Sequence, residues 1–298
     1  MDEGIEWNRK IVKEILHLPG IEVERPRATN KQISQKSIHI DTITPLGETI
    51  ITGMTYFHND VFTKALNVKR KDNKDGKNHY VYSTHFGLSE NVLHSYMINC
   101  FDGDGFTFYS FLTPVQISII DTTEGVFASS EEYTKIFNLL DEGKFDYEKL
   151  EIPSKKISKA VQFASGKGTP VVLILKNVNG NLEVIFSSCQ EEFIVKTNDL
   201  LNEISIYFSK NDAIVTKKLE KIQRDTVCNC LSIKDVVENV ANGKVAAFYC
   251  EKTDAKVFEI ESYLEGGEVL GFQETLSDQK DILDGRKTNW IAFASRRL

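Results

Sequence analysis

Residues 37–52 read SIHIDTITPLGETIIT and carry the clearest structural pattern near the start of the chain. Apolar and polar side chains alternate along residues 37–42, which is typical of a half-buried strand. A Pro-Leu-Gly turn separates this run from the β-branched residues that end the stretch, and two such runs around a turn predict a β-hairpin. Because His39 stands between two isoleucines, we expect its side chain on the sheet face opposite to theirs.

The rest of the chain mixes helical and extended patterns. The spacing of apolar residues predicts a first helix over residues 5–18, before a Pro-Gly pair that ends it. Ser129 and Glu132 have the spacing of a helix capping box. Asn179 and Gly180 predict a second hairpin turn. We expect further helices over residues 92–100, 198–224 and from 232, and strands over residues 79–84, 115–120, 171–175, 182–186, 245–249 and 290–294.

Composition narrows the class of protein. The chain has 298 residues, of which 41% are hydrophobic and 27% charged, so it has enough apolar side chains for a substantial core. Its five cysteines are an odd, ordinary number, which favours free thiols and a cytoplasmic location over a disulfide framework. No apolar run approaches the length of a membrane span, and we expect neither a signal peptide nor a membrane partner.

The charge balance argues against strong nucleic-acid binding. The formal net charge is −7, with 36 basic and 43 acidic residues. Residues 113–215 are the most acidic third, with 10 basic and 15 acidic side chains. A protein that neutralises many phosphates normally has a basic face. We therefore expect no DNA partner, although a local basic patch is compatible with this total.

Several segments, in the same order along the chain, resemble one family. Residues 53–66 (GMTYFHNDVFTKAL) resemble the proline-pocket segment of prolyl-tRNA synthetases, and residues 81–91 (VYSTHFGLSEN) resemble the start of their motif 3. Residues 113–117 (TPVQI) resemble the entry to their anticodon-binding domain. Residues 243–250 (GKVAAFYC) and 292–297 (AFASRR) are similar to the C-terminal domain of the archaeal and eukaryotic type.

This resemblance covers about residues 35–298 and implies an α+β and α/β protein of three successive domains. Residues 1–112 are expected to form a truncated class II catalytic-like domain with a partial antiparallel sheet. Residues 113–215 would form an anticodon-binding-type α/β domain, and residues 216–298 a small α/β C-terminal domain. By comparison with the family, we expect motifs 1 and 2 to be missing from this chain.

Departures from the family pattern suggest that the scaffold is kept without the chemistry. Asn91 stands where motif 3 has an arginine that binds ATP, and a neutral amide cannot supply that charge. The family's structural zinc uses four cysteines, of which Cys250 alone remains. The C-terminal region otherwise offers Cys228 and Cys230 and no histidine. Because a zinc site needs four ligands, we expect no metal.

We therefore predict no catalytic residues and no cofactor, but a degenerate amino-acid pocket. By the resemblance, its residues are Thr55, Tyr56, His58, His85, Phe86 and Asn91.

The favoured function is that of a catalytically inactive binding or regulatory module, whose partner is a protein, a tRNA or a small ligand. The alternatives are a subunit of a split prolyl-tRNA synthetase that would use ATP, a tRNA-binding accessory protein, or a different enzyme that reuses the pocket. The sequence leaves the oligomeric state open.

Overall fold

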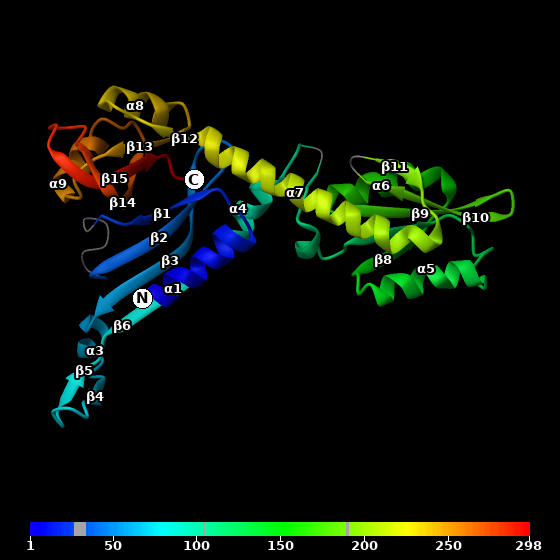
Figure 1. Ribbon diagram of the computed structural model, residues 1–298, viewed down its shortest axis with the longest axis horizontal. Coiled ribbons are helices and arrows are strands. Elements are labelled where there is room, and N and C mark those ends of the chain that lie inside the picture. The colour runs from blue at the N-terminus through cyan, green and yellow to red at the C-terminus, as the bar shows by residue number, and fades with distance from the viewer. Residues whose placement is uncertain (27–33, 104, 189–190) are drawn as a thin grey trace. The chain divides into compact units, whose positions relative to one another are not determined.

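The computed structural model describes residues 1–26, 34–103, 105–188 and 191–298. They form an α+β protein of two compact units (Figure 1). Unit 1 combines Met1–Asn99 with Leu219–Leu298, and unit 2 is Cys100–Lys218. This differs from the expected succession of three segments, because strands from both ends of the chain pair in one sheet. No helix in the described ranges is both long enough and apolar enough to cross a membrane.

An eight-stranded sheet organises unit 1. The antiparallel pair of β1 and β14 joins the N-terminal strands to the C-terminal strands, and neither of these two strands was expected from the sequence. The hairpin expected over residues 37–52 is confirmed as β2 and β3. In order across the sheet, the strands are β12 (Val227–Asn229), β13 (Val245–Tyr249), β15 (Lys287–Ser295), β14 (Glu268–Lys280), β1 (Gly20–Glu24), β2 (Lys36–Ile43), β3 (Thr49–Asn59) and β6 (Ser83–Leu88).

The helices of unit 1 cover this sheet or extend from its edge. The first expected helix is α1 (Asp2–Arg9), which continues as the π-helical turn η1 (Lys10–Ile15). A small arm between β3 and β6 contains α3 and a two-stranded sheet of its own. The remaining elements are α3 (Val61–Ala65), β4 (Lys69–Lys71), β5 (Asn78–Tyr80), α4 (Asn91–Cys100), α8 (Ile233–Ala241) and α9 (Asp254–Glu261).

The core of unit 1 contains residues from both ends of the chain. Ile21 and Val23 of β1 pack in one buried cluster with Val245 of β13 and Leu270 of β14. A second cluster lies between α8, α9 and strands β13–β15. Burying each such aliphatic side chain contributes roughly 1.5–3 kcal/mol. The hydrophobic effect therefore holds together segments that are more than two hundred residues apart.

Unit 2 has a five-stranded mixed sheet built from consecutive chain. The strands expected over residues 115–120 and 171–175 lie in this same sheet as parallel neighbours, β7 and β9. Across the sheet the order is β11 (Glu192–Ile194), β10 (Asn181–Ser187), β9 (Val171–Val178), β7 (Ile117–Asp121) and β8 (Tyr147–Glu151). The helical elements are η2 (Ser110–Leu112), α5 (Glu131–Glu142), η3 (Ser154–Lys156), α6 (Ile157–Gly166), η4 (Thr197–Asp199) and the part of α7 (Leu200–Thr226) up to Lys218.

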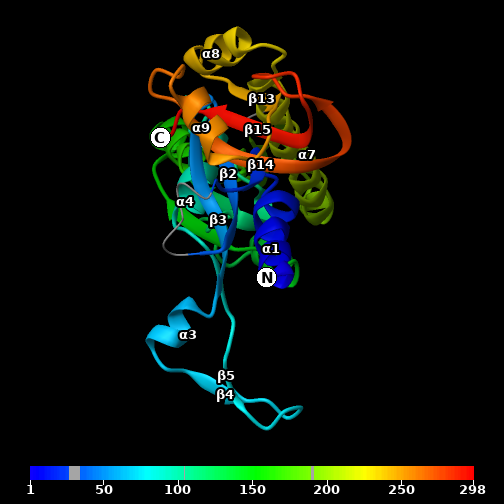
Figure 2. The same cartoon turned by 90° about the vertical axis from the view of Figure 1, so that its left-hand side faces the viewer.

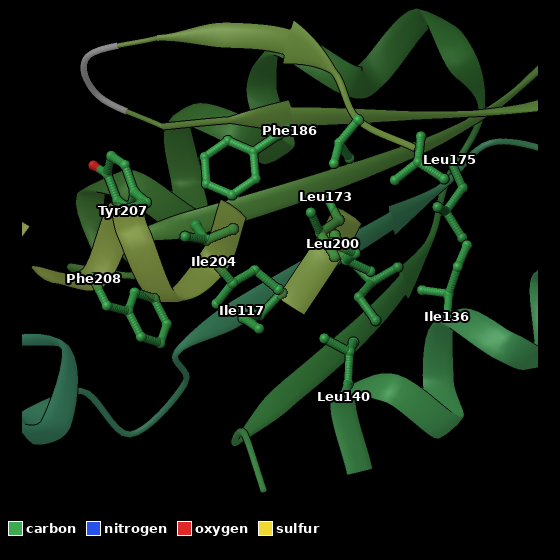
Figure 3. Close-up of a cluster of buried hydrophobic side chains, with 14 of the residues drawn as sticks. Ile117, Ile136, Leu140, Leu173, Leu175, Phe186, Leu200, Ile204, Tyr207 and Phe208 are labelled. Atoms are coloured by element: carbon green, nitrogen blue, oxygen red, sulfur yellow. The ribbon is translucent and has the colours of Figure 1, made fainter. Parts of the chain in front are cut away.

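Helices cover both faces of the unit 2 sheet. Figure 3 shows Ile136 of α5 and Ile204 of α7 among the side chains that fill the core against Leu173 of β9. On the other face, α6 packs through Ala164. The expected cap of α5 is wrong by one residue. The helix begins at Glu131, so the hydroxyl of Ser130, and not that of Ser129, accepts the hydrogen bond from a first-turn N–H.

Candidate functional site

Three of the six expected pocket residues lie together on one face of the unit 1 sheet. Tyr56 of β3 is paired with His85 of β6, and directly opposed residues of antiparallel strands point to the same face. The rings of Tyr56 and His85 are 6.4 Å apart, centre to centre, and nearly perpendicular. His58 stacks on Tyr56 with a centroid separation of 5.7 Å. We call Tyr56, His58 and His85 the aromatic triad.

Two other expected residues, Thr55 and Phe86, lie on the opposite face, beneath α1. They are paired with each other one position along from the Tyr56–His85 pair, and side chains alternate between faces along a strand. Asn8 of α1 donates a hydrogen bond to Thr55 Oγ1 at 3.2 Å. A Cβ atom on Gly4 would lie 2.6 Å from Phe86 Cγ, so glycine at this position permits the close contact. Both residues thus anchor α1 and do not line the face of the triad.

The sixth expected residue, Asn91, is the first residue of α4. Its side-chain amide donates to the carbonyl oxygen of Ile51 at 3.1 Å, and its backbone N–H lies 3.3 Å from the Ser89 hydroxyl. The Asn91 side chain therefore ties the start of α4 to the middle of β3. It is uncharged, and its amide is already engaged by the protein's own backbone.

A buried polar network extends from the triad, and sequence reasoning did not predict it. His39 of β2 lies edge-on to Tyr56 with a centroid separation of 5.2 Å, on the face that the alternation predicts. Arg25, which follows β1, donates to His39 Nδ1 at 2.9 Å and to Asp41 Oδ1 at 2.6 Å, and also to the carbonyl of Leu270 in β14. One guanidinium therefore links β1, β2 and β14.

The environment of His39 fixes its protonation state. Burial, together with the nearby positive charges of Arg25 and Arg297, lowers the pKa of His39 to about 3. The ring is therefore neutral at pH 7. Because Nδ1 accepts from Arg25, the proton is on Nε2, which is buried and has no hydrogen-bond partner among the described residues. An unsatisfied buried donor beside Tyr56 is a strong attachment point for an acceptor.

The cations of this face are engaged by carboxylates. Arg297 near the C-terminus donates to Asp41 Oδ1 at 3.2 Å and to Glu268 of β14. Asp41 is thus shared between two arginines, and its Oδ2 has no hydrogen-bond partner within the described part of the chain. Desolvation raises the pKa of Tyr56, so its hydroxyl stays protonated at neutral pH. The face offers neutral donors and acceptors suited to a small polar ligand.

Residues that could hold a metal occur in two other places. Burial raises the pKa of Cys230 to about 11 and that of Cys250 to about 12, so both side chains are protonated thiols at neutral pH. A thiol must lose its proton before it can bind zinc, so both are poor zinc ligands. On the arm, ligand atoms of Asp72, Asp75 and His79 lie within 4.8 Å of one another. All three residues are exposed, and groups of exposed acidic side chains commonly occur without a bound ion.

A cavity of about 760 Å³ lies in unit 2, beside the start of α5 and the turn that joins β9 to β10. Its lining alternates acidic and basic groups with aliphatic ones. Lys135 donates to Asn198 and Thr197 donates to Glu132 across its wall. None of the expected site residues lines it.

Comparison of the sequence with known proteins points to one family. The proline–tRNA ligase of Methanobrevibacter smithii is 26% identical over 99% of this chain and 64% of its own length. The ligase of Thermoplasma volcanium is 23% identical over 99% of this chain and 63% of its own length. The chain thus spans somewhat less than two thirds of these curated relatives. No family model matches it.

Solved structures agree on the fold. A Giardia lamblia prolyl-tRNA synthetase in complex with prolyl-adenylate superposes with a TM-score of 0.87 at 14% identity, over 100% of this chain and 67% of the other. A Cryptosporidium parvum prolyl-tRNA synthetase, complexed with halofuginone and AMPPNP, gives a TM-score of 0.84 at 13% identity and covers 63% of that chain. The chain is a distant homologue of prolyl-tRNA synthetases, which are class II enzymes, over its whole length.

Proposed function

We propose that this distant homologue of prolyl-tRNA synthetases is a non-catalytic binding module, which holds a small polar ligand at the aromatic triad without activating it. The proposal rests on the charge and the hydrogen bond of the Asn91 side chain. At the position where the resemblance places an ATP-binding arginine, the side chain is neutral and donates to the carbonyl of Ile51.

The energetic argument concerns the charge that develops when a carboxylate attacks the α-phosphate of ATP. Removing one preorganised donor to such charge costs on the order of 3–4 kcal/mol of barrier, which slows the reaction roughly a hundred- to a thousandfold. Arg25 and Arg297 do not supply the missing charge, since both are engaged with Asp41. The proposal is therefore ligand binding without turnover.

The ligand we propose is a small amino acid such as proline. The buried Nε2–H of His39 is a donor for a carboxylate, and the Tyr56 ring lies edge-on to the His39 ring. His58 and His85 supply further polar edges around the same tyrosine. We assign unit 2 the role of an anticodon-binding-type domain retained as scaffold, and propose that residues 219–298 correspond to the family's C-terminal domain without its zinc.

Two assays test this proposal on the full-length chain. Titration calorimetry with proline measures binding, and proline-dependent exchange of pyrophosphate into ATP measures activation. We expect saturable binding that Tyr56→Phe and His85→Ala weaken, and exchange at the level of a buffer blank. His94→Ala is the matched control, because His94 is an exposed histidine on α4 outside the triad. Robust exchange that Asn91→Ala abolishes would show that the chain is an enzyme.

A tRNA-binding accessory role is the second candidate. The fold match that covers the whole chain, unit 2 included, favours it, whereas the acidic balance of residues 113–215 opposes it. Filter binding with a tRNA transcript at two salt concentrations separates the two candidates. Binding that weakens steeply with salt supports the accessory role, since phosphate contacts release counterions. We expect no such binding.

A further inference from the structure

A cavity of about 320 Å³ lies in unit 1, where the chain between η1 and β1 meets the last turns of α7 (Figures 1 and 2). Residues from 13 to 19 line one side of it, and residues from 219 to 224 line the other. All of them belong to unit 1, and none is a residue of the aromatic triad. Small-molecule sites commonly have volumes from about 300 Å³ upward, so the cavity can hold a small ligand.

The backbone on the first side of this cavity has two uncommon features. η1 is a π-helical turn, in which the N–H of Leu16 donates to the carbonyl oxygen of Ile11 at 3.0 Å. Turns of this kind are rare and occur frequently at functional sites. His17 has φ +47°, a left-handed conformation that is uncommon for a residue other than glycine. Strained backbone concentrates at binding and catalytic sites, where the surrounding structure holds it in place.

The amine of Lys13 is held in the same wall without a contacting counterion. Its Nζ donates to the carbonyl oxygen of Gly20, and the N–H of Gly20 donates in turn to Oε1 of Gln223. Lys13 takes part in no ion pair with a residue in the described ranges. The nearby carboxylate of Glu22 is held instead by Arg9, at 2.7 and 3.0 Å. The amine therefore lines the cavity with its charge uncompensated.

The protonation of Lys13 follows from this environment. Burial lowers the pKa of Lys13, and the charge of Glu22 opposes this shift only in part. More of Lys13 is therefore neutral at pH 7 than of a fully exposed lysine. A neutral amine can donate one N–H to the Gly20 carbonyl and keep its lone pair available for attack on an electrophile. A desolvated lysine amine is the usual nucleophile in the formation of imines with carbonyl compounds.

The other side of the cavity offers a positive charge and groups that can carry a proton. Arg224 lines it with a side chain that is 74% exposed and lies 3.6 Å from the carboxylate of Asp225, an exposed pair that holds the guanidinium weakly. A guanidinium in this position can bind a carboxylate of a ligand. Glu220 and His17 also line the cavity and are suited to proton transfer. The cavity thus fits a carbonyl group next to a carboxylate.

We propose that Lys13 forms a reversible imine with a small 2-oxo acid, whose carboxylate pairs with Arg224. The amine nitrogen attacks the carbonyl carbon and passes one proton to the carbonyl oxygen, which gives a carbinolamine. The hydroxyl group then leaves as water with a proton passed by His17 or Glu220, and the second amine proton returns to that group as the C=N bond forms. One water is released, and no oxidant or reductant is consumed.

Two simpler ligands fit the cavity less well. An anion bound without a covalent bond would need Lys13 as an ammonium, whereas burial disfavours that charge. A neutral aldehyde could react with Lys13 but would leave Arg224 without a partner on the ligand. The 2-oxo acid uses both groups, and each simpler ligand gives a different result in the experiment below.

Reductive trapping tests the proposal on the full-length chain. The chain is incubated at about pH 7 with glyoxylate and sodium cyanoborohydride, which reduces an imine to a stable secondary amine, and mass spectrometry locates the labelled lysines. We expect Lys13 to be labelled at least about tenfold faster than Lys234, whose side chain is 82% exposed, because the cavity holds the carbonyl beside the amine. Lys13→Arg keeps the positive charge, and we expect labelling of Lys234 in this variant to be unchanged.

Arg224→Ala tests the assignment of the carboxylate. It should slow the labelling of Lys13 by glyoxylate about three- to fivefold, as expected for an exposed charge pair. It should not change the labelling by propanal, which has the carbonyl group without the carboxylate. The matched control is Lys221→Ala, because Lys221 is an exposed cation of the same helix that does not line the cavity. We expect this control to label Lys13 as the unchanged chain does.

Three results overturn the proposal. The first is equal labelling of Lys13 and Lys234 in the unchanged chain, a comparison that depends on no variant. The second is saturable binding of glyoxylate in calorimetry without a label at Lys13, which would show a site for an anion only. The third is labelling of Lys13 that Arg224→Ala does not slow. Circular dichroism verifies that the variants fold. Proline binding is measured separately on Lys13→Arg and should be unchanged, so the proposed function stands or falls independently.

Discussion

The two units of this protein are stabilised by contacts of very different range along the chain. Unit 2 is one continuous segment, Cys100–Lys218, whose sheet and helices follow one another along the chain. Unit 1 draws its sheet from both ends of the sequence, and Arg25, Asp41 and Arg297 form a buried ionic network across that junction. The difference teaches that local patterns predict most of unit 2, namely β7, β9, β10, α5 and α7, whereas the sheet of unit 1 depends on partners that no local pattern reveals.

The largest expected effect comes from breaking the ionic network of unit 1. Arg25→Ala leaves Asp41 buried with weaker compensation, and losing one partner of a buried pair typically costs about 3–5 kcal/mol. Urea unfolding followed by tryptophan fluorescence measures the loss, because Trp7 and Trp290 both lie in unit 1. The control is Arg224→Ala, whose side chain is 74% exposed. Equal effects of the two substitutions would contradict the importance of the network.

The corresponding test in unit 2 removes a core side chain. Leu173 is fully buried between the sheet and its helices, so Leu173→Ala should cost about 2–5 kcal/mol. Hydrogen exchange measured by mass spectrometry should then show faster exchange in residues 100–218 and unchanged exchange in β1 and β14. Coupled loss of protection in both units would show that they unfold as one and remove the distinction between them.

A glycine contact between the two ends of the chain gives a smaller effect. Gly47 has φ +81°, and a Cβ there would overlap the carbonyl oxygen of Gly243. Gly47→Ala places an alanine in a left-handed backbone conformation and displaces the backbone at Gly243. Together we expect these two effects to lower the free energy of unfolding by about 2–4 kcal/mol. Gly76 has φ +70° with nothing within 4 Å of its Cβ position, so Gly76→Ala isolates the backbone penalty of about 1–2 kcal/mol. Thermal unfolding should rank the two in this order.

At neutral pH the smallest expected effect comes from His39, whose contribution to the pH dependence of unit 1 stability grows only as the pH falls below 6.5. Its pKa is about 3 in the folded chain, against 6.5 as the ordinary value. Below pH 6.5 the unfolded chain binds a proton that the folded chain does not, so stability is fully present above pH 6.5 and falls toward pH 3. The slope approaches about 1.4 kcal/mol per pH unit for one proton. His39→Gln should flatten the dependence of unit 1 stability between pH 6.5 and 4; an unchanged slope would assign it to other groups.

Sequence patterns predicted most of unit 2 and parts of unit 1. The strand at Val245–Tyr249 and the helix that begins after Ser232 are confirmed, because alternation and capping act within a few residues. The hairpin at residues 37–52 is confirmed for the same reason. β1 and β14 were not predicted. β1 pairs mainly with β2 and β14 mainly with β15, and the two meet across the chain at Glu24 and Phe272.

In the candidate site, too, some residues could be predicted from the sequence and others could not. Tyr56, His58 and His85 were expected from the resemblance, and the register of β3 against β6 brings them to one face. The same register places Thr55 and Phe86 beneath α1, because a shift of one residue along a strand reverses the face. His39 could have been found by its alternation with apolar neighbours. Arg25, Asp41 and Arg297 gave no signal, because charged residues that are distant in sequence carry no mark of their pairing.

The sequence by itself determined the family resemblance, the two hairpins, the helices α1, α4, α5, α7 and α8, and the uncharged side chain at Asn91. These depend on residue type and on spacing over a few positions, where hydrogen bonds and alternation operate. Only the tertiary structure decided that the two chain ends share one sheet and that Asn91 is held by the Ile51 carbonyl. Folding also buried Arg25 against Asp41. Burial and pairing are properties of three-dimensional neighbours, and these neighbours are fixed only when the hydrophobic surfaces of distant segments pack together.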